Sequence, residues 1–211
     1  MAVVASGSAT APRALPDELA FERSGQIWIV GANGTKQRAV TRGYTPTWTS
    51  DGLRLAFVRE LGRNAEIFSA DADGRNLRRL TRSASIDLSP AWSPDGMRIG
   101  FVSNRHGRYE LYVMRADGKG TQRLLPAATR GDAFSPAWSP DGRLIAFSSS
   151  VWTPENPEIY VVRPDGTGRR RLTKTKGSVD VLGDDGWPSW APGGKRIAFS
   201  ATAPVTARSG S

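Results

Sequence analysis

Apolar and polar residues alternate over short stretches along most of the chain, and Asp-Gly or Asn-Gly pairs separate several of these stretches. Alternation with a period of two is typical of β-strands, and such a pair between two alternating runs predicts a tight hairpin turn. No apolar run approaches the ~18 residues that a transmembrane helix needs. The pattern therefore predicts an all-β protein that does not insert into membranes.

The alternating segments are copies of one repeat unit. Ser-Pro-Ala-Trp-Ser-Pro-Asp-Gly occurs at 89–96 and at 135–142, and looser copies occupy 45–52 and 187–194. A Phe follows the Trp of every copy after nine residues. A fixed period of this length indicates a repeat architecture. The repeated tryptophans are spaced by 44, 46 and 52 residues and are Trp48, Trp92, Trp138 and Trp190.

Each unit predicts four short strands, A to D. Strand A contains the Trp, strand B ends at the Phe, strand C begins with a motif such as Glu158-Ile159-Tyr160, and strand D ends in Arg-Leu. Strand C is apolar on both faces, and strand B has a small residue, such as Ala146, between two large ones. Both features suit sheets that stack face to face. Four strands at this period predict the blades of a β-propeller.

Three units are complete, and partial units flank them. The N-terminal stretch supplies strands B, C and D, and the C-terminal stretch supplies A and B, so we expect four to five blades of four-stranded antiparallel sheet. An open propeller exposes sheet edges and apolar faces. We therefore expect a closed small ring in which 187–201 packs beside 17–42; part of a six-bladed ring is the alternative.

The expected domain organisation follows from the extent of the repeat. The propeller domain spans 17–201, and flexible tails occupy 1–16 and 202–211. No second domain is expected within these limits.

The units resemble the propeller repeats of the TolB family, in which Trp-Ser-Pro-Asp-Gly precedes Ile-Ala-Phe, Glu-Ile-Tyr-Val, Asp-Gly and Arg-Arg-Leu-Thr. The fourth copy departs from this pattern with Gly193-Gly194 in place of Asp-Gly. The resemblance implies a bacterial, extracytoplasmic propeller, although Met1–Ala5 has neither the basic flank nor the apolar length of a secretory signal. The match is fullest at 138–142, 145–147, 158–161, 165–166 and 170–173.

Connection lengths indicate which end of the propeller carries function. Because the strands alternate in direction, A–B and C–D turns share one end, and B–C and D–A connections share the other. The distances that span A–B and C–D turns are constant, at nine and seven residues. Those that span B–C connections are 12, 16, 16 and 18 residues, and those that span D–A connections are 8, 12, 14 and 18. Variable loops on a rigid scaffold are where binding residues usually lie.

The candidate binding residues come from these variable connections. Carboxylates in D–A connections should ring the mouth of the central channel and suit a cation, a basic peptide or a polar ligand, while aspartates that cap turn amides would serve structure alone. The aromatic residue of the long third B–C loop belongs to no repeat position, which suits an exposed anchor. The predicted partner-binding set is Asp87, Asp132, Asp185, Trp187, Trp152, Glu155, Arg63, Arg105, His106 and Arg108.

The positive net charge of the chain and the placement of its arginines bear on the class of partner that it could bind. The chain has 29 Lys+Arg against 20 Asp+Glu, a net charge of +9, and many of its arginines lie on or beside strand D. We interpret these arginines as protection of an exposed sheet edge, with a basic rim for acidic surfaces as the alternative. Nucleic acid is not expected as a partner, because aromatic residues for base stacking do not alternate with these arginines.

Few catalytic chemistries fit the sequence. There is no Cys and one His, and there is no Gly-x-Ser-x-Gly elbow, phosphate-binding loop or zinc motif. We therefore expect no enzyme activity, cofactor or metal. The predicted function is a TolB-like propeller scaffold that binds a protein or peptide through its B–C and D–A loops. The alternative is a metal-dependent, lactonase-like hydrolase that uses Asp87, Asp132 and Asp185.

Overall fold

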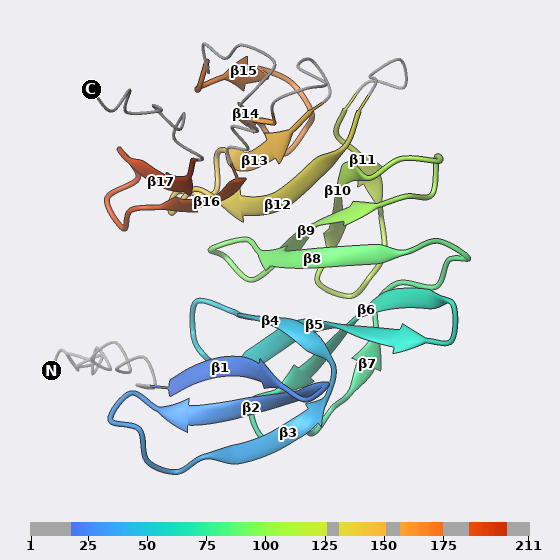
Figure 1. Ribbon diagram of the computed structural model, residues 1–211, viewed down its shortest axis with the longest axis vertical. Coiled ribbons are helices and arrows are strands. Elements are labelled where there is room, and N and C mark those ends of the chain that lie inside the picture. The colour runs from blue at the N-terminus through green and yellow to red at the C-terminus, as the bar shows by residue number, and fades with distance from the viewer. Residues whose placement is uncertain (1–17, 126–130, 151–156, 175–185, 202–211) are drawn as a thin grey trace, which may run out of the picture.

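The computed structural model describes residues 18–125, 131–150, 157–174 and 186–201, and within these ranges the regular structure is entirely β. The expected tails at 1–16 and 202–211 lie outside the described residues. Five antiparallel sheets follow one another in chain order and fan out as successive layers (Figure 1). This arrangement confirms the predicted propeller blades.

The sheets are units 1 to 5 of the repeat. Unit 1 contains β1 (Glu18–Arg23), β2 (Gln26–Gly31) and β3 (Arg38–Arg42). Unit 2 contains β4 (Tyr44–Trp48), β5 (Arg54–Leu61), β6 (Asn64–Asp71) and β7 (Arg78–Arg79). Unit 3 contains β8 (Asp87–Trp92), β9 (Arg98–Ser103), β10 (Glu110–Arg115) and β11 (Gln122–Arg123). Unit 4 contains β12 (Ala133–Trp138), β13 (Ile145–Ser149), β14 (Glu158–Val162) and β15 (Arg170–Arg171), and unit 5 contains β16 (Gly186–Trp190) and β17 (Ile197–Ser200).

Successive units stack face to face through matching apolar residues. Between units 2 and 3, the small Ala56 of strand B, with Ile67 and Leu80, meets Trp92 and the aliphatic and aromatic residues of β9 and β10. The same arrangement recurs between units 3 and 4, where the indole nitrogen of Trp138 also donates a hydrogen bond of 3.0 Å to the carbonyl of Ala91. The tryptophans therefore pack between blades, as their recurrence predicted.

The A–B turns are held by a hydroxyl and a carboxylate. Ser139 Oγ donates to Asp141 Oδ1 at 2.6 Å, and the same Oδ1 accepts a hydrogen bond from the backbone N–H of Arg143. Units 2 and 3 make the same pair of contacts. In unit 5, Ala191 and Gly193 occupy the corresponding positions, so both polar partners are missing together.

Three strand-D arginines are bound to buried carboxylates. Glu66, Glu110 and Glu158 lie at or near the start of strand C with at most 3% exposure, and each accepts a hydrogen bond from the Arg located 13 residues later. The interpretation of strand-D arginines as edge protection is therefore wrong for these three residues, because a buried carboxylate needs a paired charge. The three arginines are Arg79, Arg123 and Arg171.

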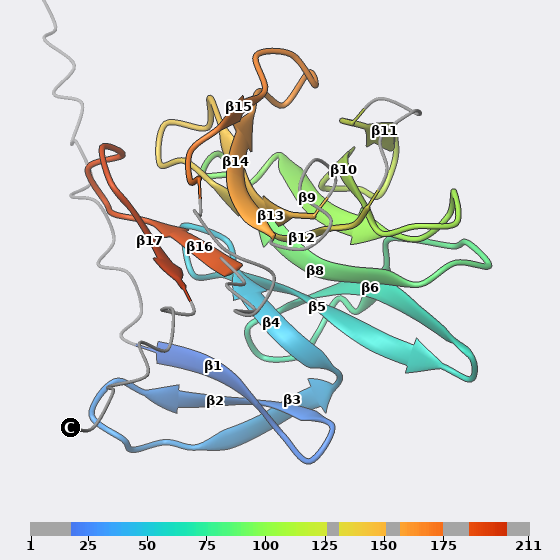
Figure 2. The same cartoon turned by 45° about the horizontal axis from the view of Figure 1, so that its top comes forward.

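The described strands form an open, partial propeller. The hairpin β16–β17 packs on β12, β13 and β14 of unit 4, and the substantial contacts of β1 are with β2 and β4 (Figures 1 and 2). The expected closure of 187–201 onto 17–42 is wrong, since unit 5 continues the stack instead of completing unit 1. Within the described ranges, no helix has the length and apolar character needed to cross a bilayer.

Candidate functional site

The B–C and D–A connections share one end of the described sheets, which we call the loop face. Within each sheet the strands pair in chain order and antiparallel, so the alternation assumed from sequence is confirmed. The constant A–B and C–D turns lie at the opposite end. All the variation in connection length therefore falls on the loop face.

A groove of about 790 Å³ opens on the loop face between units 1 and 2. It lies where the β1–β2 turn, the β3–β4 connection and the β5–β6 hairpin meet. Its lining combines acidic, basic and aromatic side chains around a glycine backbone and consists of Glu22, Gly25, Thr41, Arg42, Gly43, Tyr44, Arg59, Glu60 and Leu61.

Gly43 fixes the backbone of this groove. Its φ of 144° lies in a region that favours glycine, and a Cβ at this position would lie 2.6 Å from the carbonyl oxygen of Val58. The close approach brings the connection from unit 1 directly against strand β5. No side chain fits here, so backbone forms this part of the groove wall.

Arg59 is the central cation of the groove. Its Nη2 donates to Thr41 Oγ1 at 2.6 Å, its Nε donates to the Arg42 carbonyl at 3.2 Å, and its guanidinium lies 4.9 Å from the centre of the Phe68 ring. Burial, and then the nearby charge of Arg42, lower the pKa of Arg59. Among the described residues no carboxylate forms an ion pair with it, which leaves a partly desolvated positive charge beside an open groove.

Arg105 of unit 3 also places its guanidinium by a strand-C aromatic ring, but its polar partner is a carboxylate. Its Nη2 lies 3.1 and 3.2 Å from the two carboxylate oxygens of Asp87, and its guanidinium lies 4.7 Å from the centre of the Tyr112 ring. Asp87 is fully buried at the first position of β8, not within a connection as expected. The structure thus brings these two predicted residues together as a mutual pair that joins a B–C loop to strand A.

Asp132 also makes structural contacts. Its Oδ1 accepts a hydrogen bond of 2.9 Å from the backbone N–H of Tyr109, which links a D–A connection to the preceding B–C loop. The Tyr109 ring in turn contacts Phe134 with ring centres 6.0 Å apart. Asp132 is half-buried.

Trp187 is a large apolar side chain that is 74% exposed. It lies in β16 instead of a connection, at a bulge with φ of 48° just before Pro188. Bulges re-aim side chains and are frequent beside functional sites. The equivalent positions in the other A strands carry small hydroxyl residues, also at positive φ: Thr45, Ser89 and Ser135.

Tyr44, Leu88 and Phe134 come immediately before those bulges, and sequence reasoning missed them as a set. They are partly exposed, with Phe134 at 38%. Burial, and then the nearby Glu60, raise the pKa of Tyr44, so its hydroxyl stays protonated at neutral pH and can donate. The signal available in the sequence was the large side chain two residues before the Pro of each complete repeat. With Trp187, these residues give the loop end of the innermost strands an apolar, aromatic character.

His106 takes part in a hydrogen-bond network. Its Nδ1 is 2.5 Å from the Tyr112 hydroxyl, which donates to Glu110 at 3.2 Å. Burial, and then the charge of Glu110, raise the pKa of Tyr112 to about 12. The His106 side chain is 54% exposed, its hydrogen-bond partner is the Tyr112 phenol, and the Glu110 carboxylate, 3.8 Å from Nδ1, is already paired with Arg123.

The remaining predicted residues are not brought together. Arg63 lies in the β5–β6 turn and Arg108 in the β9–β10 loop, and both are exposed. Trp152, Glu155 and Asp185 lie outside the described residues. Within the described ranges no cluster of three or more His, Cys, Asp or Glu side chains could hold a metal ion.

The family model described as the TolB beta propeller domain matches residues 19–126, about half of the chain. No curated protein sequence matches the chain. Among solved structures, TolB from Acinetobacter baumannii is 24% identical with a TM-score of 0.70, over 82% of this chain and 42% of that one. A putative TolB from Agrobacterium tumefaciens is 25% identical with a TM-score of 0.73, over 89% and 67%. The chain thus spans less than half the length of the Acinetobacter protein.

More distant similarity extends to enzymes. An oligogalacturonate lyase in complex with manganese is 15% identical with a TM-score of 0.64, over 90% of this chain and 74% of that one. At this identity the likeness concerns the fold alone.

Proposed function

The chain belongs to the TolB β-propeller domain family, and from that premise we propose that it is a non-catalytic scaffold that binds a protein or peptide through its loop face. One observation carries this proposal: the connections of variable length, the groove around Arg59 and the exposed aromatic positions all lie at the same end of the blades. Binding surfaces commonly place aromatic and Arg anchors on a rigid scaffold.

The chemistry of the loop face favours an extended partner that has both apolar and acidic groups. Arg59 offers a desolvated cation without a carboxylate of its own among the described residues, so a partner carboxylate would gain a charge-assisted hydrogen bond there. Tyr44 offers a protonated hydroxyl in the same groove. Trp187, 74% exposed, offers a large apolar contact that costs little conformational entropy on binding.

Affinity capture with matched variants tests this proposal. Partners captured by the wild-type protein should be lost with Trp187→Ala and with Arg59→Gln. They should be retained with Met97→Ala, which removes an equally accessible apolar side chain (68% exposed) from the opposite end of unit 3. For a partner identified in this way, each loop-face variant should weaken binding by about tenfold or more. Equal loss with Met97→Ala would contradict the assignment of the site to the loop face.

The hydrolase alternative has its own test. It requires a metal at Asp87, Asp132 and Asp185, and Asp87 already binds Arg105 through both carboxylate oxygens. Lactone or ester substrates should be assayed with added divalent metals. Turnover that is abolished by a chelator and by Asp132→Asn would establish the alternative and displace the scaffold proposal.

A further inference from the structure

The arginine stacked on two aromatic rings in unit 3 shows what surrounds such a group when its charge is neutralised. The guanidinium of Arg105 lies 5.4 Å from the centre of the Phe101 ring and 4.7 Å from that of Tyr112. Its Nη2 lies 3.1 and 3.2 Å from the two carboxylate oxygens of Asp87, which is fully buried. A stacked, partly buried guanidinium in this protein is therefore accompanied by a carboxylate from strand A of its own unit.

Unit 2 places a guanidinium in the same aromatic surroundings. Arg59 lies 5.8 Å from the centre of the Phe57 ring and 4.9 Å from that of Phe68. The two rings are stacked and have the strand B and strand C positions that Phe101 and Tyr112 have in unit 3. Within the described chain, however, the polar partners of Arg59 are a threonine hydroxyl and a backbone carbonyl. Unit 2 thus repeats the cation and the rings without the carboxylate.

Gly43 accounts for the absence of that carboxylate. Asp87 lies five residues before the Trp of unit 3, and Gly43 lies five residues before Trp48 of unit 2. A Cβ at Gly43 would lie 2.6 Å from the carbonyl oxygen of Val58, so close packing excludes an aspartate at this position. Instead of a carboxylate of its own unit, the guanidinium borders a groove of about 790 Å³.

The other charges of this groove favour an anion with a single charge. Burial, and then the charge of Arg42, lower the pKa of Arg59, so an anion between them would be favourable to both. The raised pKa of Tyr44 keeps its hydroxyl protonated at neutral pH, and this hydroxyl can donate. Two exposed carboxylates, Glu22 and Glu60, also line the groove. They would repel a multivalent anion such as phosphate more strongly than a carboxylate.

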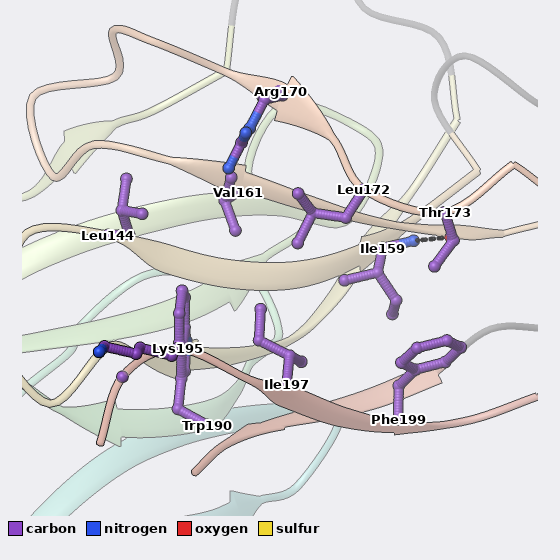
Figure 3. Close-up of a pocket in the computed structure, with 11 residues that line it drawn as sticks. Leu144, Ile159, Val161, Arg170, Leu172, Thr173, Trp190, Lys195, Ile197 and Phe199 are labelled. Carbon is purple, nitrogen blue, oxygen red and sulfur yellow. Dashed lines mark hydrogen bonds between the residues drawn. The ribbon is translucent and has the colours of Figure 1, made fainter. Parts of the chain in front are cut away.

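The groove between β14, β15 and β17 has a different chemistry (Figure 3). It measures about 400 Å³, and its lining is mostly apolar and contains no acidic residue. In Figure 3, Ile197 and Phe199 point from β17 towards Ile159 and Leu172. Apolar contacts of this kind do not distinguish one class of ligand from another, whereas a desolvated cation without a carboxylate selects an anion.

We propose that the groove around Arg59 binds the side-chain carboxylate of an Asp or Glu residue of the partner. The carboxylate would accept hydrogen bonds from the Arg59 guanidinium, as Asp87 does from Arg105, and the Tyr44 hydroxyl would donate to the same group. A side chain is favoured over a chain terminus, because the carboxylate that neutralises the stacked arginine of unit 3 is itself a side chain. This inference rests on the proposed loop-face function and specifies the chemical group that is recognised there.

Titration of the isotope-labelled full chain with short peptides, followed by NMR, tests the proposal. The probe is acetyl-Ala-Asp-Ala-Ala-amide, whose carboxylate lies in a side chain, and its matched control carries Asn in place of Asp. The Asp peptide should give saturable shifts of the Arg59 Nε–H and of the amides at 41–44 and 59–61. Its dissociation constant should be lower than that of the Asn peptide by about tenfold or more. Acetyl-tetra-alanine with a free carboxyl terminus and inorganic phosphate are the competing anions, and both should bind more weakly.

Protein variants locate the binding site. Arg59→Gln should reduce binding of the Asp peptide to the level of the Asn peptide. Arg82→Gln removes the same charge from an exposed position in the β7–β8 connection of the loop face, and should leave binding unchanged.

A carboxylate supplied from within should compete with the peptide. Thr41 Oγ1 lies 2.6 Å from Arg59 Nη2, so Thr41→Asp places a carboxylate beside the guanidinium. This variant should bind the Asp peptide about tenfold or more weakly and should melt at a higher temperature than wild type. Thr41→Asn is the uncharged control of the same shape, and should keep most of the affinity without the gain in melting temperature.

Four results would overturn the proposal. These are equal binding of the Asp and Asn peptides, binding that Arg59→Gln leaves unchanged, tighter binding of the free-terminus peptide or of phosphate than of the Asp peptide, and undiminished binding by Thr41→Asp. Because the titration uses no captured partner, its failure leaves the loop-face scaffold proposal standing. Failure of the scaffold proposal would instead appear in the capture experiment with Trp187→Ala and Met97→Ala.

Discussion

The inner units and the end units have the same strand pattern but differ in how completely they are held together. Unit 3 has a buried Trp, a hydroxyl–carboxylate turn and a buried Glu110–Arg123 pair. Unit 5 has a half-buried Trp190 and neither polar member of that turn, and unit 1 has Gln26 where the inner units have Glu. Polar and aromatic features that recur in the inner units are thus partly missing from the two end units of the described sheets. Of these features the Trp packs on the preceding blade, whereas the turn and the ion pair lie within one blade.

The largest expected effect comes from the interface tryptophans. Trp138→Ala should lower the free energy of unfolding by ~3–5 kcal/mol, because it empties a packed site between units 3 and 4. Trp190→Ala should cost about half of that or less, since Trp190 is only half-buried. Chemical denaturation followed by tryptophan fluorescence measures both. Equal losses would remove the distinction between inner and end interfaces.

The buried ion pairs give the next effect. Arg123→Met leaves the Glu110 carboxylate buried with only the Tyr112 hydroxyl and His106 nearby, and should cost about 3 kcal/mol. The double variant Glu110→Gln, Arg123→Met should recover much of that loss, because no charge remains buried. The same denaturation series measures both variants. A double variant no more stable than Arg123→Met would show that packing of the Arg side chain, not its charge, matters.

Restoring the turn of unit 5 should produce a smaller gain. Ala191→Ser with Gly193→Asp supplies the hydroxyl and carboxylate found in the inner units, and a Cβ at Gly193 would meet no atom within 4 Å. The expected gain is about 1 kcal/mol. Hydrogen exchange at 191–196 reports the local effect, and a loss of stability would mean that the turn of unit 5 has a different geometry.

The smallest effect is the pH dependence of the inner turns. The hydroxyl of Thr49 and then the N–H of Leu53 lower the pKa of Asp51, and Ser93 and then the N–H of Met97 lower that of Asp95. A lowered folded-state pKa contributes stability above the unfolded value of about 4, and this is lost as pH falls through the folded value. Asp51→Asn with Asp95→Asn should therefore flatten the decline of stability below about pH 4. An unchanged decline would assign acid sensitivity to other groups.

Much of the fold could be predicted because the repeat reports contacts that every unit makes. The positions of Trp92 and Trp138, the Asp-Gly turns and the small Ala146 all express local strand geometry or the contact with the next unit. The ion pairs of Glu66, Glu110 and Glu158 were missed although their 13-residue spacing to Arg is regular, because a charged residue at a strand start looks solvent-exposed until the stacking is known. Ring closure was predicted wrongly because it depends on distant segments meeting, which no local pattern encodes.

The candidate site was less predictable. The loop face could be predicted from the connection lengths. The groove around Arg59 could not, because it depends on the close approach of Gly43, in the β3–β4 connection, to β5. Asp87 was predicted to bind a ligand, but its carboxylate is bound to Arg105. Repeat positions are constrained by packing and can be inferred from recurrence. The residues of variable loops are constrained only by their particular neighbours.

The position of each ion pair within a single C–D hairpin has a consequence for how such a chain can change in length. Glu158 and Arg171 lie in adjacent strands of one unit. Insertion or deletion of a whole unit therefore adds or removes both charges together and leaves neither of them buried without a partner. Pairing a carboxylate with an arginine from a neighbouring blade would instead make every such event costly. A whole unit, which contains its own C–D hairpin and ion pair, is therefore an increment by which blade number can vary without redesign of the buried electrostatics.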